Sequence, residues 1–366
     1  MTYRERCADR VACRSLLETG SQSFALAARL LPRAVRDDAT ALYAFCRVAD
    51  DAIDESVAPR EALDDLQQRL DAIAEGRPQA YAVDRAVADV VARRDIPVAL
   101  LASLVEGLSW DVTGHAFDTP ADTKDYAVRV AATVGLMMTC LMGIRDADTL
   151  TRAGELGMAM QMTNIARDVA ADGRQGRCYV PARQRLKAFG HERLPEAAEW
   201  SRPEGRAMVA ALLAEADAYY GAAWSGIQRL PRGCRTAIRA AALIYREIGQ
   251  VIAARGHDAS LGRAVVPRRV KWRLAVRAMR AGPGPNGREN ARPTAPRELQ
   301  RLVALCQRPA RSSVRLDPKT LRWWQLVARW AWVVELFGEL AERERLDSPR
   351  EATSNEISGS ISSSPR

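Results

Sequence analysis

The chain has 366 residues, a formal net charge of +9 and a pI of about 9.5. Its length allows one large domain or two ordinary ones, and its 48% hydrophobic and 27% charged residues are typical of a soluble globular protein. Alanine, leucine and arginine dominate while Phe and Tyr are sparse, which favours helices. Seven scattered cysteines without a CxxC pair and three isolated histidines argue against a disulfide framework and a zinc site, and for reduced thiols in the cytoplasm.

Helical periodicity runs through most of the chain, and no alternating strand pattern of useful length appears. In residues 36–55, apolar side chains recur three, four and four positions apart, on one face of a helix: Leu42, Phe45, Ala49 and Ile53. A Gly-rich polar loop is expected at 172–176. Further helices are expected at 63–74, 96–112, 128–144, 156–169, 206–228 and 236–254. The sequence therefore predicts an all-α protein with a single helical bundle domain at residues 10–280.

The C-terminal part of the chain differs in composition. Proline and glycine are concentrated near its start, so we expect a linker at 281–300. Residues 301–350 are expected to form an amphipathic helical extension, and residues 351–366 a Ser-rich disordered tail. Within the extension, the stretch 320–344 carries four tryptophans: Trp323, Trp324, Trp330 and Trp332.

Positive charge is concentrated in residues 263–280, which hold seven basic residues and no acidic one. Such a patch is compatible with a solvated helix face, a membrane surface or nucleic acid, but no nucleic-acid recognition motif accompanies it. The N-terminus has no apolar signal region, and the longest uncharged run, 130–144, is too short to span a membrane. We therefore expect no nucleic-acid partner, and a cytoplasmic protein bound peripherally to the inner face of the membrane.

Two segments of matching layout carry polar side chains along one helix face. The first set is spaced four, three and four residues apart: Tyr43, Arg47, Asp50 and Asp54. The second set is spaced three, four and four residues apart: Gln161, Asn164, Asp168 and Asp172. Apolar neighbours surround both sets, where carboxylates are costly unless compensated, and oxygen ligands suit Mg²⁺ or Mn²⁺. The arginines Arg47 and Arg167 beside them indicate an anion such as a diphosphate, although exposed helices with i,i+4 charge pairs remain an alternative.

Residues 161–181, QMTNIARDVAADGRQGRCYVP, closely resemble the second acidic motif of the phytoene and squalene synthase family, and residues 43–55, YAFCRVADDAIDE, resemble its first. Residues 20–27, GSQSFALA, look like its N-terminal substrate-binding turn, and residues 245–258 resemble its last core helix. The resemblance covers residues 12–280 and implies an isoprenoid-synthase-type bundle with a central apolar cavity. The candidate cavity wall is the Met-rich stretch with Val134, Met137, Met138, Leu141 and Met142.

The resemblance also implies a role for each matching position. The metal ligands, on two sides of the cavity, would be Asp50, Asp54, Asn164, Asp168 and Asp172. The diphosphate or its metal shell would be held by Arg47, Gln161 and Arg167, with Tyr43 at the ionising site. Further residues at the diphosphate end would be Gly20, Ser21, Gln22, Ser23, Tyr179, Tyr245 and Arg263. The sequence departs from the family at Gln22, where a basic residue is frequent, and at Ala171, where an acidic one is frequent.

The activity implied by the resemblance is that of a Mg²⁺- or Mn²⁺-dependent prenyltransferase of carotenoid biosynthesis. It would join two geranylgeranyl diphosphates head to head into phytoene through prephytoene diphosphate, a cyclopropyl intermediate, releasing diphosphate. A C15 enzyme making squalene, dehydrosqualene or hydroxysqualene is an alternative, because cavity depth sets the chain length. A non-catalytic family member and a basic nucleic-acid binder are alternatives of other classes. ATP as an activator and a downstream phytoene desaturase as a partner are implied by the resemblance alone.

Overall fold

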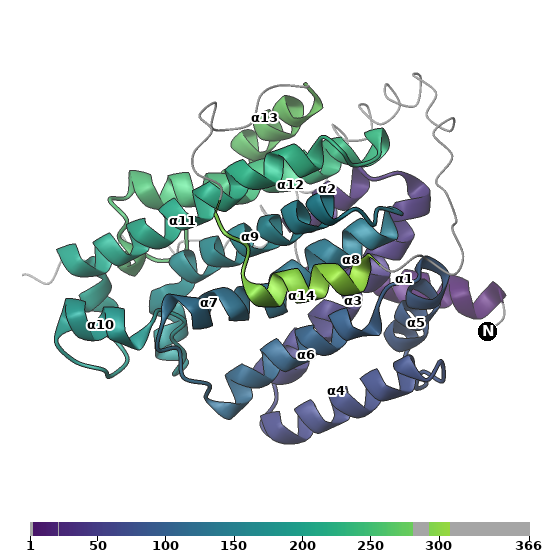
Figure 1. The fold of residues 1–366 in the computed structure, drawn as a ribbon, viewed down its shortest axis with the longest axis horizontal. Coiled ribbons are helices and arrows are strands. Elements are labelled where there is room, and N and C mark those ends of the chain that lie inside the picture. The colour runs from purple at the N-terminus through teal and green to yellow at the C-terminus, as the bar shows by residue number, and fades with distance from the viewer. Residues whose placement is uncertain (1–2, 21, 281–292, 308–366) are drawn as a thin grey trace, which may run out of the picture. The chain divides into compact units, whose positions relative to one another are not determined.

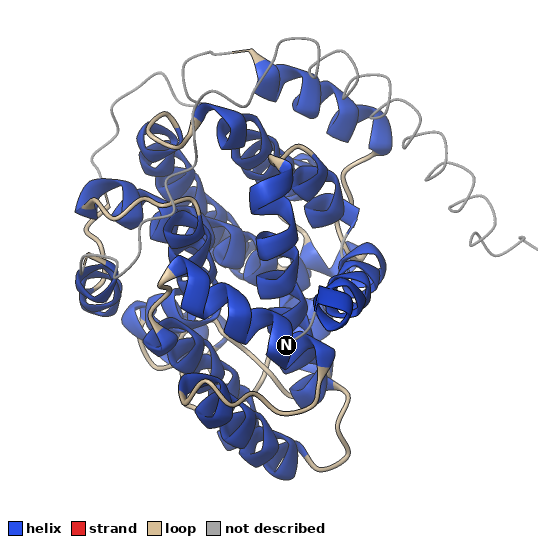
Figure 2. Ribbon diagram, turned by 90° about the vertical axis from the view of Figure 1, so that its right-hand side faces the viewer, coloured by secondary structure: helices blue, strands red, loops and turns tan. Residues whose placement is uncertain are grey.

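The computed structural model describes residues 3–20, 22–280 and 293–307, and within these ranges the chain forms helices joined by short loops, with no strand (Figures 1 and 2). The α-helices are α1 (Tyr3–Gly20), α2 (Gln22–Arg29), α3 (Arg33–Asp54), α4 (Pro59–Ala74), α5 (Ala82–Arg94), α6 (Val98–Thr113), α7 (Pro120–Ala127), α8 (Thr133–Leu141), α9 (Ala147–Arg174), α10 (Ala182–Phe189), α11 (Pro203–Ile227), α12 (Arg232–Ala254), α13 (Arg268–Met279) and α14 (Arg297–Cys306). A π-helix, η1 (Val128–Ala132), and two 3₁₀-helices, η2 (Ala197–Ser201) and η3 (Ala259–Leu261), complete the set. The all-α prediction is confirmed for these residues.

Local sequence signals set several helix boundaries. Proline lies in the first turn of α4, α7 and α11, where a backbone N–H would have no acceptor within the helix, so that its absence costs no hydrogen bond. At the start of α7 the Asp122 carboxylate accepts a hydrogen bond from the backbone N–H of Thr119 at 2.7 Å. Asp146 caps α9 by accepting from the backbone N–H of Thr149 at 2.9 Å. With this cap, α9 begins at Ala147, nine residues before the start at residue 156 that the apolar periodicity predicts.

The apolar face predicted for residues 36–55 is confirmed in α3. Its four members are at most 3% exposed: Leu42, Phe45, Ala49 and Ile53. This face holds α3 against α1, α4, α5 and α6. Consequently the polar set of α3, which lies on a different side of the helix, is turned away from these neighbours and remains available to line a cavity.

Helix α9 lies among α8, α11, α12 and α14 at the middle of the bundle (Figure 1). Glycines let its backbone touch the preceding segment. A Cβ atom added at Gly157 would lie 2.4 Å from the carbonyl oxygen of Ala131, and one added at Gly135 would lie 2.3 Å from that of Ala153. No larger residue fits at either position without moving a backbone, so the spacing of α9 from η1 and α8 depends on these two glycines.

The structure differs from the predicted elements at two places that matter for the site. The helix expected at 128–144 begins as the π-helix η1, which directly follows α7, and is α-helical only from Thr133 to Leu141; a π-turn widens the helix locally and is frequent at functional sites. The loop expected at 172–176 begins later, because α9 continues to Arg174 and the chain turns at Gly176, whose φ is 78°. Asp172 therefore lies within the last turn of α9 and extends its polar ladder.

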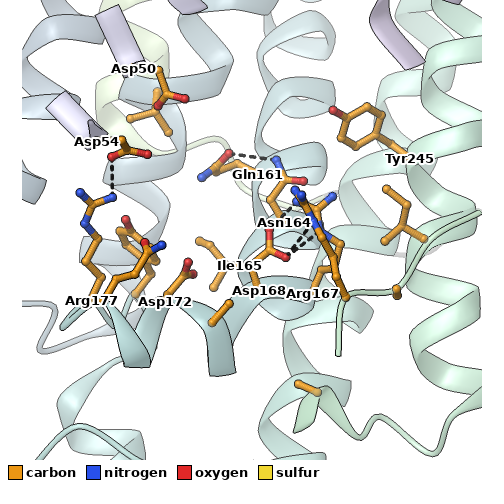
Figure 3. A pocket seen from close by; sticks show the side chains of 18 of the residues that line it. Asp50, Asp54, Gln161, Asn164, Ile165, Arg167, Asp168, Asp172, Arg177 and Tyr245 are labelled. Carbon is orange, nitrogen blue, oxygen red and sulfur yellow. Dashed lines mark hydrogen bonds and ion pairs between the residues drawn. The ribbon is translucent and has the colours of Figure 1, made fainter. Parts of the chain in front are cut away.

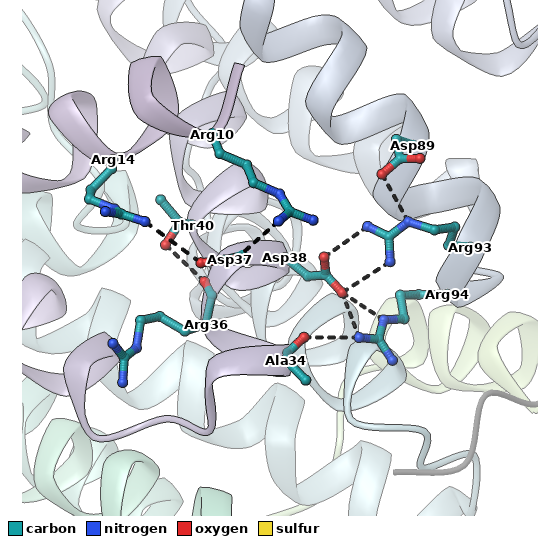
Figure 4. Close-up of polar contacts among 10 residues, drawn as sticks. All are labelled: Arg10, Arg14, Ala34, Arg36, Asp37, Asp38, Thr40, Asp89, Arg93 and Arg94. Carbon is teal, nitrogen blue, oxygen red and sulfur yellow. Dashed lines mark hydrogen bonds and ion pairs between the residues drawn. The ribbon is translucent and has the colours of Figure 1, made fainter. Parts of the chain in front are cut away.

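Buried ion pairs fasten the N-terminal helices to one another (Figure 4). The buried carboxylate of Asp38 on α3 accepts a hydrogen bond from Arg93 Nη2 at 2.8 Å and another from Arg94 Nε at 2.7 Å, both on α5. The adjacent Asp37 faces two arginines of α1 (Figure 4). Two guanidinium groups balance the negative charge of one buried carboxylate, so these ion pairs hold α3 against α5.

The C-terminal prediction is tested only in part. Residues 297–300, assigned to the linker from the sequence, form the first turn of α14, which packs on α9 and α8 through buried Leu299, Leu302 and Val303. Residues 281–292 and 308–366 lie outside the described residues, and so do the four tryptophans of the predicted extension and the predicted tail. In the described part of the chain, no helix combines the length and apolar character needed to cross a membrane.

Candidate active site

The two polar ladders face one cavity of about 900 Å³ between α3, α9 and α12. Figure 3 shows the carboxylates of α3 on one side and those of α9 on the other. The residues that the sequence assigns to the site and that line this cavity are Tyr43, Arg47, Asp50, Asp54, Gln161, Asn164, Arg167, Asp168, Asp172, Tyr179, Tyr245 and Arg263. The structure therefore brings both motifs together, which excludes two independent exposed helix faces.

On α3, the two ladder carboxylates differ in their surroundings. Asp54 accepts a hydrogen bond from Arg177 Nη1 at 2.7 Å, whereas the pKa of Asp50 is raised to about 6, first by burial and then by the negative charge of Asp54. Arg47 forms an i,i+4 ion pair with Asp51, with Nη2 2.6 Å from Oδ1, and still lines the cavity. An added positive charge would therefore stabilise the ionised form of the half-buried Asp50.

On α9, Asp168 is paired, whereas Asp172 forms no ion pair with any residue that the structure describes. Arg167 Nε donates to Asp168 Oδ1 at 2.9 Å (Figure 3). Arg263 Nε lies 3.4 Å from the same oxygen. Burial raises the pKa of Asp172 to about 7, with the charge of Asp168 as the next cause. Asp172 therefore keeps its proton to a higher pH than an ordinary aspartate does.

Asn164 has an unused acceptor at the centre of the same ladder. Its Nδ2 donates to Gln161 Oε1 at 3.4 Å, while its Oδ1 is buried and has no hydrogen-bond partner among the described residues. A buried acceptor without a donor costs free energy unless a ligand satisfies it. Together with the raised carboxylate pKa values and the all-oxygen donor set, this atom fits a hard divalent cation such as Mg²⁺.

The carboxylates do not assemble a closed metal site on their own. Within the described ranges, no group of three His, Cys, Asp or Glu side chains converges closely enough to hold an ion. Each ladder instead offers pairs of carboxylates across an open cavity. An anionic ligand with several oxygens would be needed to complete the coordination of an ion there.

Sequence reasoning missed an acid opposite the ladders. Asp111, near the end of α6, lines the cavity and accepts hydrogen bonds from Tyr126 Oη and Tyr179 Oη, both at 2.9 Å. The two tyrosine rings stack with centroids 4.6 Å apart. Burial raises the pKa of Asp111 and the two hydroxyls oppose that rise. The signal in the sequence was one carboxylate at the end of an apolar helix, without the repeat that marks the ladders.

The remaining wall of the polar cavity includes residues that the sequence analysis identified and others that it missed. Arg263 is 68% exposed at the mouth of the cavity, while Tyr245 lies deeper, where burial raises the pKa of its phenol. Arg177 and Lys271 also line the cavity and were not identified from the sequence. The predicted N-terminal turn is not placed: Ser21 and the side chains of Gln22 and Ser23 lie outside the described residues, and Gly20 is the last residue of α1.

A second, apolar cavity of about 310 Å³ adjoins the polar one. The two share wall residues, among them Tyr43, Gln161 and Tyr245. Of the predicted Met-rich wall, three residues line the apolar cavity: Val134, Met138 and Met142. The other two, Met137 and Leu141, are buried in the core, because they lie on the opposite face of α8. An apolar cavity thus lies next to the polar one, and the two have part of their wall in common.

Comparison with known proteins agrees with this geometry. Residues 17–275 match the family described as squalene/phytoene synthase. The phytoene synthase of Cereibacter sphaeroides is 46% identical over 296 residues, covering 76% of this chain and 82% of its own. The 15-cis-phytoene synthase of a Paracoccus species is 41% identical over 249 residues, covering 66% of this chain and 81% of its own.

Solved structures show the same fold. A dehydrosqualene synthase in complex with a ligand superposes with a TM-score of 0.68 at 29% identity, covering 75% of this chain and 97% of its own. A squalene synthase from Alicyclobacillus acidocaldarius gives 0.63 at 25% identity, covering 70% of this chain and 97% of its own. With paired acidic ladders facing one cavity, a matching fold and close sequence relatives, the chain belongs to the squalene/phytoene synthase family.

Proposed function

We propose that the protein is a prenyltransferase that condenses two geranylgeranyl diphosphates head to head into phytoene, with release of both diphosphates. The observation that carries the proposal is the polar cavity with facing acidic ladders, next to an apolar cavity that shares part of its wall. Its relatives named phytoene synthase, up to 46% identical over most of the chain, support a C20 substrate and a role in carotenoid biosynthesis.

The proposed metal is Mg²⁺, or Mn²⁺ in its place. The residues that would hold it are Asp50, Asp54, Asn164, Asp168 and Asp172. Two observations support this: the buried acceptor of Asn164 has no partner in the described part of the chain, and the pKa values of Asp50 and Asp172 are raised by burial. When bound, the ions supply positive charge that stabilises a departing diphosphate.

The basic side chains of the cavity would bind and orient the two diphosphates. Arg47, Arg167 and Lys271 line it from three different helices, and Arg177 and Arg263 lie at its loops. Bidentate arginine contacts suit phosphate oxygens and hold them in one orientation. Positive groups already fixed around the leaving group cost no reorganisation when the C–O bond breaks.

The apolar cavity would hold the isoprenoid chains and keep water away from the cations. In the expected reaction, one C–O bond ionises, the double bond of the second chain attacks, and proton loss closes a cyclopropane. The second C–O bond then ionises, the skeleton rearranges and a second proton is lost. A carbocation in contact with water would be quenched, so the walls formed by Val134, Met138 and Met142 have a chemical role.

Product analysis tests the substrate class. Purified protein would be given equal concentrations of geranylgeranyl and farnesyl diphosphate with Mg²⁺, and the extracted hydrocarbons separated by chromatography. We expect phytoene as the main product. A C30 hydrocarbon as the main product would show that the C15 alternative is right, and no hydrocarbon from either substrate would favour a non-catalytic family member.

We also propose that the mouth of the polar cavity docks on an anionic membrane surface. Residues 259–280 contain no acidic side chain, and η3, α13 and the loop between them expose four large apolar side chains among arginines: Leu261, Val265, Trp272 and Met279. Arg263, Val265 and Lys271 from this region line the cavity itself. Amphipathic surfaces of this composition suit the headgroup region, and each basic residue there contributes about 1 kcal/mol of attraction. A hydrocarbon product released here would enter the bilayer, from which a phytoene desaturase could take it.

Vesicle sedimentation tests the docking surface. Wild-type protein should pellet with anionic vesicles at low salt and be released as salt is added, because screening weakens the attraction. Reversing two exposed charges of α13, as in Arg269→Glu with Arg273→Glu, should release it at lower salt, whereas Arg60→Glu on α4 serves as a control of equal charge change per site. Wild-type protein that stays in the supernatant at low salt would refute the proposal.

A further inference from the structure

Helix α9 lines both the polar and the apolar cavity with one face. Lining residues three or four positions apart follow this face from the polar end to the start of the helix: Asn164, Gln161, Gly157, Ala153 and Thr149. The first two line both cavities, whereas the last three, and Arg152 beside them, line only the apolar one. With a rise of about 1.5 Å per residue, Arg152 lies about 18 Å from Asn164 along the axis of α9. Arg152 and Thr149 are therefore at the end of the apolar cavity that is remote from the candidate metal ligands.

Buried residues close this remote end. Thr149 lines it from α9, and Ile227 and Leu230 line it from the end of α11 and the turn after it, each at most 5% exposed. Helix α11 comes so close to α9 here that a Cβ atom added at Gly226, another lining residue, would lie 2.3 Å from Arg152 Cβ. The aliphatic part of the Arg152 side chain therefore lies directly over Gly226, where the apolar cavity ends.

Two carboxylates of α9 hold the guanidinium of Arg152 in place. Arg152 Nη1 donates to Glu155 Oε2 at 2.5 Å, and Arg152 Nε lies 3.5 Å from Asp148 Oδ1. The side chain of Glu155 is only 1% exposed. If Arg152 moved away, the buried carboxylate of Glu155 would lose this guanidinium, which is costly in a protein interior. Arg152 is therefore held rigidly, and a ligand in the apolar cavity cannot push it aside easily.

We propose that Arg152 sets the maximum length of the isoprenoid chain that the apolar cavity accepts. This inference rests on the proposed function, in which the polar cavity fixes the diphosphate and the hydrocarbon extends along α9. The separation of about 18 Å between Asn164 and Arg152 is close to the length of an extended C20 chain, so a chain one isoprene unit longer meets Arg152. An apolar chain end offers the guanidinium no hydrogen bond in exchange for its ion pair with Glu155. Arg152 thus determines substrate length without touching the reacting atoms.

Titration calorimetry with unreactive thiolodiphosphate analogues carrying C15, C20 and C25 chains tests the proposal in the presence of Mg²⁺, without turnover. The double variant Arg152→Ala with Glu155→Gln opens the end of the cavity and leaves no charge of Glu155 unpaired. We expect its affinity for the C25 analogue, relative to the C20 analogue, to rise about 10-fold or more, because even one methylene group in an apolar pocket changes binding by about 10–200-fold. Arg152→Met with Glu155→Gln is the matched control. It removes the same charges but keeps a long side chain, so its ratio should stay that of the wild type.

A third variant changes the cavity in the opposite direction. Ala153→Leu adds bulk to the lining beside Arg152 and should lower the affinity for the C20 analogue relative to the C15 analogue. Both analogues are measured with the same protein, so a loss of folded protein changes the stoichiometry and not the ratio of affinities.

The proposal and the proposed function fail in different ways. An unchanged ratio of C25 to C20 affinity in the Arg152→Ala double variant, or an equal rise in the Arg152→Met control, would overturn the length limit. Wild-type protein that binds the C25 analogue as tightly as the C20 analogue, or that binds none of the analogues, would overturn it as well. Wild-type protein that prefers the C20 analogue but makes no hydrocarbon would contradict only the proposed reaction, and the rise in the double variant would still support the length limit.

Discussion

Replacing Asp172 by asparagine should stabilise the metal-free protein. Burial and the charge of Asp168 raise the pKa of Asp172 from its ordinary 3.8 to about 7, while Arg177 and Arg167 oppose the rise. An acid whose pKa is higher in the folded state holds its proton more tightly there. The protonated side chain of Asp172 therefore contributes to the stability of the folded state at low pH. This contribution to the free energy of unfolding is lost as the pH rises from about 4 through 7.

The magnitude follows from the size of the shift. A rise of about three pKa units corresponds to about 4 kcal/mol between the fully protonated and fully ionised limits. Because the cavity is open to water, screening reduces this value, and we expect Asp172→Asn to raise the free energy of unfolding by about 1–3 kcal/mol at pH 8. Asparagine keeps the shape of the side chain and removes only its charge. Asp50, whose pKa is raised to about 6, should behave similarly but less strongly.

Urea denaturation in EDTA at pH 5 and pH 8 measures the effect. The variant should be more stable than the wild type at pH 8, and the difference should shrink at pH 5, where Asp172 is protonated in the folded wild type. Asp64→Asn, at an exposed position of α4, is the control and should change little at either pH. An Asp172→Asn variant that is no more stable than the wild type at pH 8 would refute the reasoning.

Three further substitutions test the cavity and the packing. Ala241→Phe, which fills part of the apolar cavity, should shift the products of mixed substrates from C40 towards C30 hydrocarbons, and an unchanged product ratio would count against this role of the cavity. Gly157→Ala should lower the free energy of unfolding by about 1–3 kcal/mol, because the new methyl group meets the backbone at Ala131; a urea titration indistinguishable from wild type would contradict this. Arg69→Met should lower the free energy of unfolding by about 3–5 kcal/mol in the same titration, because the fully buried carboxylate of Asp84, which Arg69 binds at 2.9 and 2.7 Å, loses its partner. Adding Asp84→Leu should recover most of this loss, and no recovery would contradict the ion-pair explanation.

The ladders could be predicted from the sequence because helical periodicity determines which residues share a face. Asp50 and Asp54, and Asp168 and Asp172, are one turn apart, so their common orientation follows once a helix is assumed. That the two ladders face one another came from the family resemblance, since periodicity gives no relation between distant helices. The structure supplies this relation through the packing of α3 and α9 around one cavity.

Features that depend on contacts between distant segments could not be predicted. Asp111 is a single carboxylate that acquires its two tyrosine partners only when α6, α7 and the loop after α9 meet. The packing of α14 on α8 and α9 is another such contact, whereas the proline- and glycine-rich composition before α14 indicated only a linker. The extent of α9 was underestimated because Asp172 and Gly173 are turn-forming residues, yet the helix continues past both.

The most direct test of the account is the turnover of geranylgeranyl diphosphate by wild-type and Asp168→Ala protein, with Mg²⁺ and with EDTA. The account predicts that wild-type protein makes phytoene, that EDTA stops this and that added Mg²⁺ restores it. In Asp168→Ala the rate should fall by at least about 10²–10³-fold, because a fixed charge that stabilises the leaving diphosphate is lost, while its circular dichroism spectrum stays that of a folded helical protein. Full phytoene synthesis by the folded Asp168→Ala variant, or by the wild type in EDTA, would contradict the central claim.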